Sequence, residues 1–144
     1  MCRRALCKSH YERHKGEYMA RNYARYRADP KCRVTTRVRT YICKKLNGSK
    51  NWRHWQDLTG WDVDMLMSHL SGQLVHPMTW ENYGSVWHID HIIPLAAFNY
   101  TRPEDMDFKK AWSLSNLRPL LAKDNLSKGS RLARQHQPSL RLSA

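Results

Sequence analysis

The chain has 144 residues and a mass of 17.1 kDa, about the size of one domain, so we do not expect a two-domain enzyme. Hydrophobic residues make up 41% and charged residues 26%, with six Trp and seven Tyr, a composition that favours a folded core over wholesale disorder. The net charge of +13 calls for a polyanionic partner, and nucleic acid is the first candidate.

The positive charge is concentrated in the first third of the chain. Residues 1–50 carry 15 Lys and Arg against 3 Asp and Glu, a net +12, whereas residues 51–144 carry 10 against 9. No apolar run approaches the roughly 20 residues that cross a bilayer, and residues 1–18 lack the apolar stretch of a signal peptide. We therefore expect an intracellular protein without a membrane partner, whose four Cys serve packing or metal binding rather than disulfides.

Two helices are predicted in the basic region. Residues 1–28 are polar and rich in Arg and Tyr, which predicts a basic helix or arm that is either solvated or, as the shortage of acidic residues favours, in contact with phosphate. After Asp29-Pro30, basic residues surround apolar positions that recur at helical spacing: Val34, Val38, Tyr41, Ile42 and Cys43. This pattern predicts an amphipathic helix that ends near Asn47-Gly48.

The central region is predicted to change from helix to strand. Residues 49–61 form a loop or short turn whose three Trp belong either to the core, which we favour, or to an interface. Asp62 is a predicted N-cap for a helix whose apolar positions are Val63, Leu66, Met67, Leu70 and Leu74. The aromatic cluster of Trp80, Tyr83 and Trp87 then leads into WHIDHIIPL, whose β-branched residues predict a strand and a Pro-bounded turn.

The last third is predicted to contain a strand and a helix. Residues 101–110 are a loop or the start of a helix, residues 114–121 supply a strand, and residues 124–134 form a final helix followed by a frayed tail. The fold class that these elements predict is α+β.

The residues with the clearest chemical character are Asp90 and His91. They are adjacent and lie among apolar residues, where a carboxylate and an imidazole need partners. The partner is either an ordinary ion pair or a metal ion. Asn116 and Asn125 are nine residues apart, one in the predicted strand and one near the start of the predicted helix, so both can fold back on Asp90. Carboxylate and amide oxygens suit Mg²⁺ or Mn²⁺, and an imidazole can take a proton from water.

At these residues the chain resembles the HNH endonucleases, the ββα-metal nuclease family that is common in phages. The resemblance covers residues 80–131 and rests on TWENYG, WHIDHIIPL, SNLRPL and KDNLSKGSR. Residues 29–46 are similar to the basic helix that small phage-type homing or nicking enzymes often carry upstream. The resemblance implies a ββα-metal core with a basic helical N-terminal extension, here a DNA-binding extension over 1–50, a nuclease domain over 51–134 and a flexible tail over 135–144.

The resemblance also implies roles for single residues. His91 would be the general base, and Asn116 the middle residue of the motif, which braces the loop that carries the base. Asp90 and Asn125 would bind the metal. Asn at the third position, where many relatives have His, implies one catalytic Mg²⁺ or Mn²⁺ ion held by two protein ligands and disfavours a zinc-bound arrangement.

Other residues are candidates for supporting roles. His88 shares a strand face with Asp90, so it either orients that carboxylate or packs in the strand. Lys128 and Arg131, in the first turns of the final helix, and Arg118 either hold the phosphate backbone or are solvated. Further predicted DNA contacts lie on the upstream helix: Arg33, Arg37, Arg39, Lys44 and Lys45.

A structural zinc site is the less favoured interpretation of the N-terminal Cys and His. Cys2, Cys7, His10 and His14 lie within 13 residues, and their spacing resembles half of a zinc knuckle found near some phage HNH domains. The other half is not convincingly present, so we expect free thiols.

The function expected from the resemblance is a metal-dependent DNA endonuclease or nickase. It would hydrolyse phosphodiesters of double-stranded DNA to 5′-phosphate and 3′-hydroxyl ends, as a monomer or weak dimer, in the host cytoplasm if a phage encodes it. Homing and phage genome packaging, the latter with a packaging partner, are both open as roles. The alternatives are a non-catalytic basic nucleic-acid-binding module and a ribosome-associated or RNA-binding protein; the second explains the charge but not the DH, Asn and Asn residues.

Overall fold

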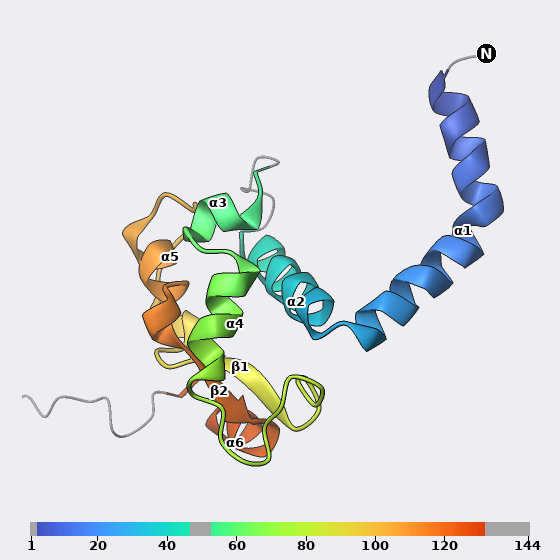
Figure 1. Ribbon diagram of the computed structural model, residues 1–144. Coiled ribbons are helices and arrows are strands. Elements are labelled where there is room, and N and C mark those ends of the chain that lie inside the picture. The colour runs from blue at the N-terminus through green and yellow to red at the C-terminus, as the bar shows by residue number, and fades with distance from the viewer. Residues whose placement is uncertain (1–2, 47–52, 132–144) are drawn as a thin grey trace, which may run out of the picture.

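A computed structural model describes residues 3–46 and 53–131, with side chains from residue 10 onward. Its elements in chain order are α1 (Arg3–Ala28), α2 (Pro30–Lys45), α3 (Trp55–Thr59), α4 (Val63–Ser71), β1 (Trp87–His91), η1 (Leu95–Ala97), α5 (Met106–Ala111), η2 (Leu114–Asn116), β2 (Leu117–Leu121) and α6 (Ala122–Lys128) (Figure 1). Helices and one two-stranded sheet thus form the described part, and the predicted α+β class is confirmed.

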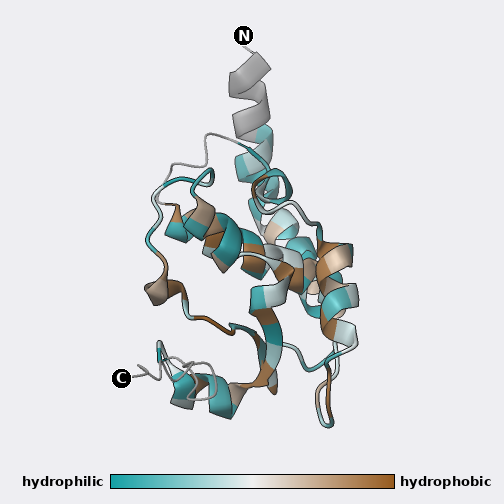
Figure 2. Cartoon of the chain, turned by 90° about the vertical axis from the view of Figure 1, so that its left-hand side faces the viewer, coloured by the Kyte–Doolittle hydropathy of each residue, from teal (hydrophilic) through white to brown (hydrophobic). Residues whose placement is uncertain are grey.

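A single residue, Asp29, separates the two long helices of the basic region. The Asp29 carboxylate accepts a hydrogen bond from the backbone N–H of Lys31 at 2.9 Å and caps α2, and Pro30 follows in the first turn, where its missing N–H costs little. α1 projects away from the rest of the molecule (Figure 1) and is largely hydrophilic (Figure 2). Both helices were predicted, and α2 ends at Lys45, two to three residues before the predicted stop. Among the described residues, no helix is long and apolar enough to cross a membrane.

α2 differs from α1 because one of its faces is buried. Val34, Val38 and Ile42 lie at helical spacing and are at most 7% exposed. They belong to one hydrophobic cluster that also contains Trp55 and Trp61, which confirms a core position for two of the three central Trp; the third, Trp52, lies outside the described residues. α2 thus packs into the same core as the later elements, across the predicted boundary near residue 50, whereas α1 projects away from that core.

Several element boundaries differ from the prediction. Asp62 caps α4 as predicted, through a 2.9 Å hydrogen bond from the N–H of Met65. Asn116, predicted in a strand, lies in the turn just before β2. The final helix starts at Ala122, directly after β2, and stops at Lys128 because Gly129 takes a positive φ of 55°, a conformation that favours glycine and ends helices.

The two strands and the final helix pack together as one unit. β1 pairs antiparallel with β2, so that Asp90 lies opposite Arg118 and Trp87 opposite Leu121, and α6 contacts both strands. β1 begins in the aromatic cluster, where the Trp87 ring is 5.2 Å from Trp80 and 4.9 Å from Tyr83 between centroids. Trp87 is fully buried and anchors the strand that carries Asp90 and His91.

Arg33 ties three parts of the fold together. Its guanidinium donates hydrogen bonds to the backbone oxygens of Arg27 at the end of α1 (2.6 Å), and of Trp80 (2.7 Å) and Glu81 (3.2 Å) before β1. Planar guanidinium groups suit such several-fold contacts. The predicted role of Arg33 in phosphate binding is therefore replaced by a structural one.

Arg33→Ala should destabilise the protein by about 2 kcal/mol, because it leaves backbone carbonyls between α2 and the later loop without their donor. Urea denaturation measures this difference. Arg39→Ala is the matched control, since Arg39 lies exposed on the same helix and its loss removes the same charge. Equal unfolding free energies for the two variants would contradict the structural role of Arg33.

Candidate active site

A cavity of about 780 Å³ lies between α2 and the unit formed by β1, β2 and α6. On the α2 side it is lined by Arg37, Tyr41, Lys44 and Lys45. The opposite wall contains five of the predicted site residues: His88, Asp90, His91, Asn125 and Lys128. The fold thus brings residues from β1 and α6, far apart in sequence, to one place beside a basic helix.

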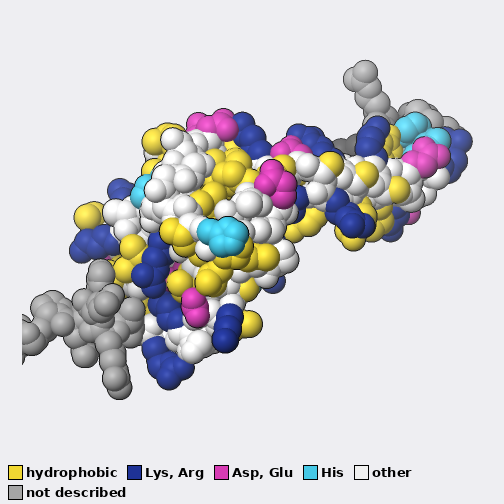
Figure 3. Space-filling view, turned by 60° about the horizontal axis from the view of Figure 1, so that its bottom comes forward, with side chains coloured by type: hydrophobic (Ala, Val, Ile, Leu, Met, Phe, Trp, Pro, Cys, Tyr) yellow, Lys and Arg dark blue, Asp and Glu magenta, His cyan; other side chains and the backbone are white. Residues whose placement is uncertain are grey.

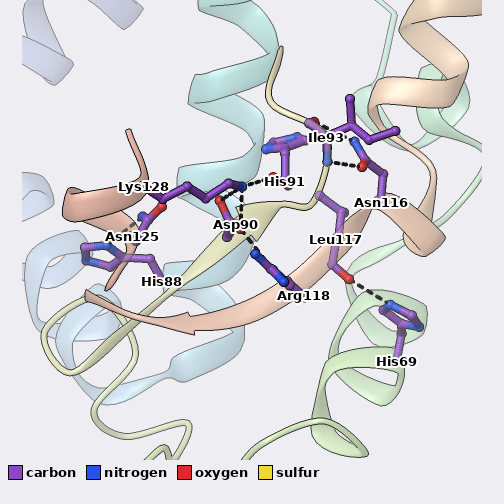
Figure 4. Close-up of polar contacts among 10 residues, drawn as sticks. All are labelled: His69, His88, Asp90, His91, Ile93, Asn116, Leu117, Arg118, Asn125 and Lys128. Atoms are coloured by element: carbon purple, nitrogen blue, oxygen red, sulfur yellow. Dashed lines mark hydrogen bonds and ion pairs between the residues drawn. The ribbon is translucent and has the colours of Figure 1, made fainter. Parts of the chain in front are cut away.

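Asp90 is a buried carboxylate that two basic side chains compensate. It is 6% exposed; Lys128 Nζ donates to Oδ1 at 2.8 Å and to Oδ2 at 2.7 Å, and Arg118 Nε donates to Oδ2 at 3.1 Å. Lys128 also donates to the backbone oxygen of His91. Figure 4 shows Lys128 reaching across from α6. The antiparallel register explains the contact of Arg118 with Asp90, because it places the two residues directly opposite each other.

These contacts change the interpretation of three predicted DNA contacts. Lys128 is the last residue of α6 rather than part of its first turns, and its side chain is only 9% exposed. Arg118 also faces Asp90 instead of solvent alone. Arg131 lies beyond α6, where its guanidinium donates to the backbone oxygen of Ser127 at 2.6 Å. In this structure none of the three presents a fully free cation.

His88 contacts Asn125 rather than Asp90. Its Nε2 lies 3.4 Å from the backbone oxygen of Gly84, and its Nδ1 lies 3.2 Å from the amide nitrogen of Asn125. With the proton on Nε2, the ring donates to Gly84 and accepts from Asn125. The amide nitrogen of Asn125 is then engaged, which leaves its oxygen for a cation. The prediction that His88 orients Asp90 is replaced by an orienting contact to the other predicted ligand.

The imidazole of His91 is held between aromatic rings. The Trp112 ring meets it edge-on at 4.9 Å, and the Tyr41 ring of α2 stacks at 6.5 Å between centroids. Nε2 is buried and has no hydrogen-bond partner in the described part of the chain. Burial lowers the pKa of His91 to about 4; the Asp90 carboxylate opposes this shift, and the ammonium groups of Lys128 and Lys45 add to it. The ring is therefore neutral at pH 7.

Asn116 supports the turn after β1 and does not line the cavity with His91. It is 6% exposed; its Oδ1 accepts from the N–H of Ile93 at 2.8 Å, and its Nδ2 donates to the backbone oxygens of Ile93 at 3.2 Å and Ala111 at 2.9 Å. The Asn116 backbone oxygen also accepts from the N–H of Ile92 at 2.8 Å. Asn116 therefore acts on His91 through the backbone and is a positioning residue.

The donors in the cavity fit a hard divalent cation better than zinc. One carboxylate, on Asp90, and one amide oxygen, on Asn125, point to Mg²⁺ or Mn²⁺ with retained waters. Within residues 10–46 and 53–131 the structure shows no group of three or more His, Cys, Asp or Glu that could hold a metal ion, so the metal site stays a prediction. Cys2 and the side chain of Cys7 lie outside the described part, so the expectation of free thiols rather than a zinc site there stays a prediction.

The remaining basic candidates on α2 have different surroundings. The Arg37 Nε donates to the Tyr26 hydroxyl at 3.1 Å, and its guanidinium lies 5.3 Å from the centre of the Tyr83 ring. Arg39, Lys44 and Lys45 are exposed, and both Lys line the cavity. Among the described basic residues that line the cavity, Lys44 and Lys45 are exposed and have no hydrogen bond or ion pair that engages their ammonium groups.

Sequence reasoning missed the roles of three side chains at this site. The contact of Lys128 with Asp90 had a signal, because Lys128 follows Asn125 by three residues and so shares its helix face. In the sequence, Tyr41 has only the pattern of an apolar helix position, and Trp112 belongs to none of the motifs. Nothing local marks either residue as a neighbour of His91.

Comparisons with known proteins find relatives in a giant virus. Two uncharacterized proteins of Acanthamoeba polyphaga mimivirus are similar to this chain: one is 33% identical over 104 residues, which cover 72% of this chain and 45% of the relative, and the other is 29% identical over 112 residues, which cover 78% and 48%. The chain thus spans about half the length of these relatives. No known family model matches the chain. No solved structure matches it either.

The lowered pKa of His91 makes a prediction about stability in the metal-free protein. The pKa is about 4 in the fold against an ordinary 6.5, so the unfolded chain binds the proton first as the pH falls. The stabilisation from the neutral ring is complete above pH 6.5, is lost between pH 6.5 and 4, and amounts to roughly 3 kcal/mol. Urea denaturation at several pH values measures it.

The matched variant for this measurement is His91→Phe, which keeps a ring and removes the titration. The difference in unfolding free energy between wild type and His91→Phe should change across pH 4 to 6.5 in favour of the wild type at higher pH. A constant difference would show that His91 titrates alike in both states.

Proposed function

We propose that the protein is a metal-dependent DNA endonuclease of the HNH type, with a ββα-metal core formed by β1, β2 and α6. One observation carries the proposal: the buried carboxylate of Asp90, the amide of Asn125 and the neutral imidazole of His91 line a single cavity whose other wall is basic. Each group was named from the sequence on the strength of the HNH resemblance, and packing brings all three to the same cavity.

His91 is the general base in this proposal. Because the ring is neutral at pH 7, a nitrogen lone pair is available to take a proton from water. A phosphodiester in the cavity adds negative charge that offsets Lys45 and Lys128, and an anion beside an imidazole raises its pKa. The ring thus becomes a stronger base as the substrate binds, while the turn held by Asn116 keeps it in place.

The reaction is hydrolysis of one phosphodiester bond. The water that gives its proton to His91 attacks phosphorus in line, and the bond from phosphorus to the 3′-oxygen breaks. The leaving 3′-oxygen takes a proton from solvent water, and the products are a 5′-phosphate and a 3′-hydroxyl. A divalent ion bound by Asp90 and Asn125 would offset the negative charge on the phosphoryl and leaving oxygens. One base and one ion serve one strand, so nicking is the expected outcome.

The basic helices supply the surface for DNA. Figure 3 shows Lys and Arg side chains along α1 and on the adjoining body of the molecule, with few acidic side chains among them on α1. Lys44 and Lys45 extend this surface to the cavity. Contacts of this kind go to phosphates and carry no base sequence, so the proposal includes duplex DNA but no target sequence.

One observation favours the alternative of a non-catalytic nucleic-acid-binding module. Asp90 is already compensated by Lys128 and Arg118, so the fold is electrostatically complete without a metal ion. The same basic surface would then bind DNA in a salt-dependent manner. A cleavage assay separates the two functions.

The wild-type protein should convert supercoiled plasmid to open circles in Mg²⁺ or Mn²⁺ and not in EDTA. His91→Ala should lower the nicking rate at least about a hundredfold, the usual contribution of a general base, while the affinity for DNA stays within about twofold because the ring is not a principal phosphate contact. Gel electrophoresis and a band-shift assay measure the two quantities.

His54→Ala is the matched control, because His54 is exposed and lies outside the cavity lining. His91→Gln keeps most of the side-chain volume should the Ala variant unfold. Plasmid that stays intact but shifted in every lane, wild type included, would refute the nuclease and favour the binding module.

The Lys44→Gln/Lys45→Gln variant should bind duplex DNA more weakly than the wild type. The slope of its log affinity against log salt concentration should be smaller by about 2, because the variant makes two fewer phosphate contacts and so releases fewer counterions on binding. Lys109→Gln/Lys110→Gln on α5 removes the same charge from exposed positions outside the cavity. Equal slopes for the two double variants would exclude the cavity rim as the DNA contact.

A further inference from the structure

The ammonium group of Lys128 lies where a cation bound by Asp90 would lie. It contacts both carboxylate oxygens, at 2.8 and 2.7 Å, and also the backbone oxygen of His91. The Lys128 side chain is 9% exposed and that of Asp90 is 7% exposed, so little water screens the pair. A surface ion pair would leave the carboxylate open to solvent, whereas here three protein oxygens surround one ammonium.

We propose that Lys128 is an internal competitor of the divalent ion: it occupies the Asp90 carboxylate in the metal-free protein and leaves it when a phosphodiester enters the cavity. The inference rests on the proposed function, because it requires that Asp90 binds a divalent ion. It adds a regulation of that site, in which metal and DNA bind cooperatively.

The competition follows from electrostatics. A divalent ion on the Asp90 oxygens would stand in direct contact with the Lys128 ammonium, and two cations at that distance in a poorly hydrated site repel strongly. Metal binding therefore requires the ammonium to move. Moving it has a cost, because a lysine that loses its partner in a buried site is left uncompensated.

DNA lowers that cost. Lys128 is the last residue of α6 and lines the cavity itself, so its flexible side chain can turn from Asp90 towards a phosphate in that space. The phosphate then compensates the ammonium. Because each ligand removes an obstacle to the other, each raises the affinity for the other by the same factor.

Arg118 makes the exchange feasible for Asp90. Its Nε donates to Oδ2 alone, from the opposite position of β2, so Asp90 keeps one compensating cation when Lys128 leaves. Oδ1 has Lys128 as its partner among the described residues and becomes free for the metal. If the ion pair between Lys128 and Asp90 were purely structural, removing Lys128 would not raise the affinity for a divalent ion. The affinity of the wild type and of a Lys128 variant can therefore be compared.

The test measures Mn²⁺ binding to the full chain by the paramagnetic resonance signal of free Mn²⁺, with and without a phosphorothioate DNA duplex that resists cleavage. Lys128→Met removes the competing charge and keeps most of the side-chain length. Lys123→Met is the matched control, because Lys123 is exposed on the same helix. Thermal melting verifies that each variant is folded, and Lys128→Gln replaces the Met variant if that one is not.

In the wild type, the duplex should tighten Mn²⁺ binding about tenfold, a typical size for coupling between two sites. Lys128→Met should bind Mn²⁺ about tenfold more tightly than the wild type without DNA, and the duplex should add little. Lys123→Met should behave as the wild type, and the duplex without protein measures the Mn²⁺ that the DNA takes up alone.

Two other outcomes would overturn the inference, and they are distinguishable. If wild-type Mn²⁺ binding is lost in Asp90→Asn but unchanged or weakened in Lys128→Met, Lys128 is not a competitor and the proposed metal site stands. If neither the wild type nor Lys128→Met binds Mn²⁺, with or without the duplex, the proposed function fails together with the inference.

Discussion

A carboxylate that is 6% exposed needs positive charge close to its oxygens, and the arrangement of this protein's last 45 described residues meets that need. Arg118 reaches Asp90 because β2 pairs with β1 in a register that sets the two residues opposite each other. Lys128 reaches it because α6 follows β2 without a loop and packs on both strands. The same packing brings Asn125 to the cavity. The packing of β2 and α6 on β1 therefore both compensates the buried charge of Asp90 and assembles the candidate site.

The basic N-terminal region contributes more than charge. α2 buries Val34, Val38 and Ile42 in the common core, and the adjoining part of its surface forms a wall of the cavity and carries Tyr41 beside the imidazole of His91. A helix that is fixed by the core can hold its cations at a constant distance from β1 and α6. The described residues of α1 contact α2 near their junction, where Arg37 Nε donates to the Tyr26 hydroxyl. In the proposed function, the contribution of α1 to DNA binding therefore depends on charge, whereas that of α2 depends also on position.

His91 and Asp90 show how one environment gives two groups opposite properties. Asp90 has two cations beside its buried carboxylate, whereas the half-buried His91 has aromatic neighbours, an Nε2 without a partner among the described residues, and a lowered pKa that keeps the ring neutral at pH 7. A neutral base beside a compensated carboxylate suits hydrolysis of an anionic substrate, because the substrate's charge favours the protonated imidazole that the reaction produces. The free protein thus holds the base in the form that the proposed reaction consumes.

Local sequence determined the elements and the identity of the candidate groups. Helical periodicity located α2 and α4, Asp29-Pro30 and the predicted Asp62 cap marked their starts, and the β-branched residues around Asp90 indicated β1, because periodicity, capping and strand propensity depend on neighbours within a few residues. Tertiary structure decided the partners: that His88 serves Asn125, that Arg33 is structural, and that Lys128 and Arg118 face Asp90. These contacts join residues that are 28 to 47 positions apart in the chain. They depend on strand register and on helix packing, and no local pattern in the sequence specifies the register or the packing.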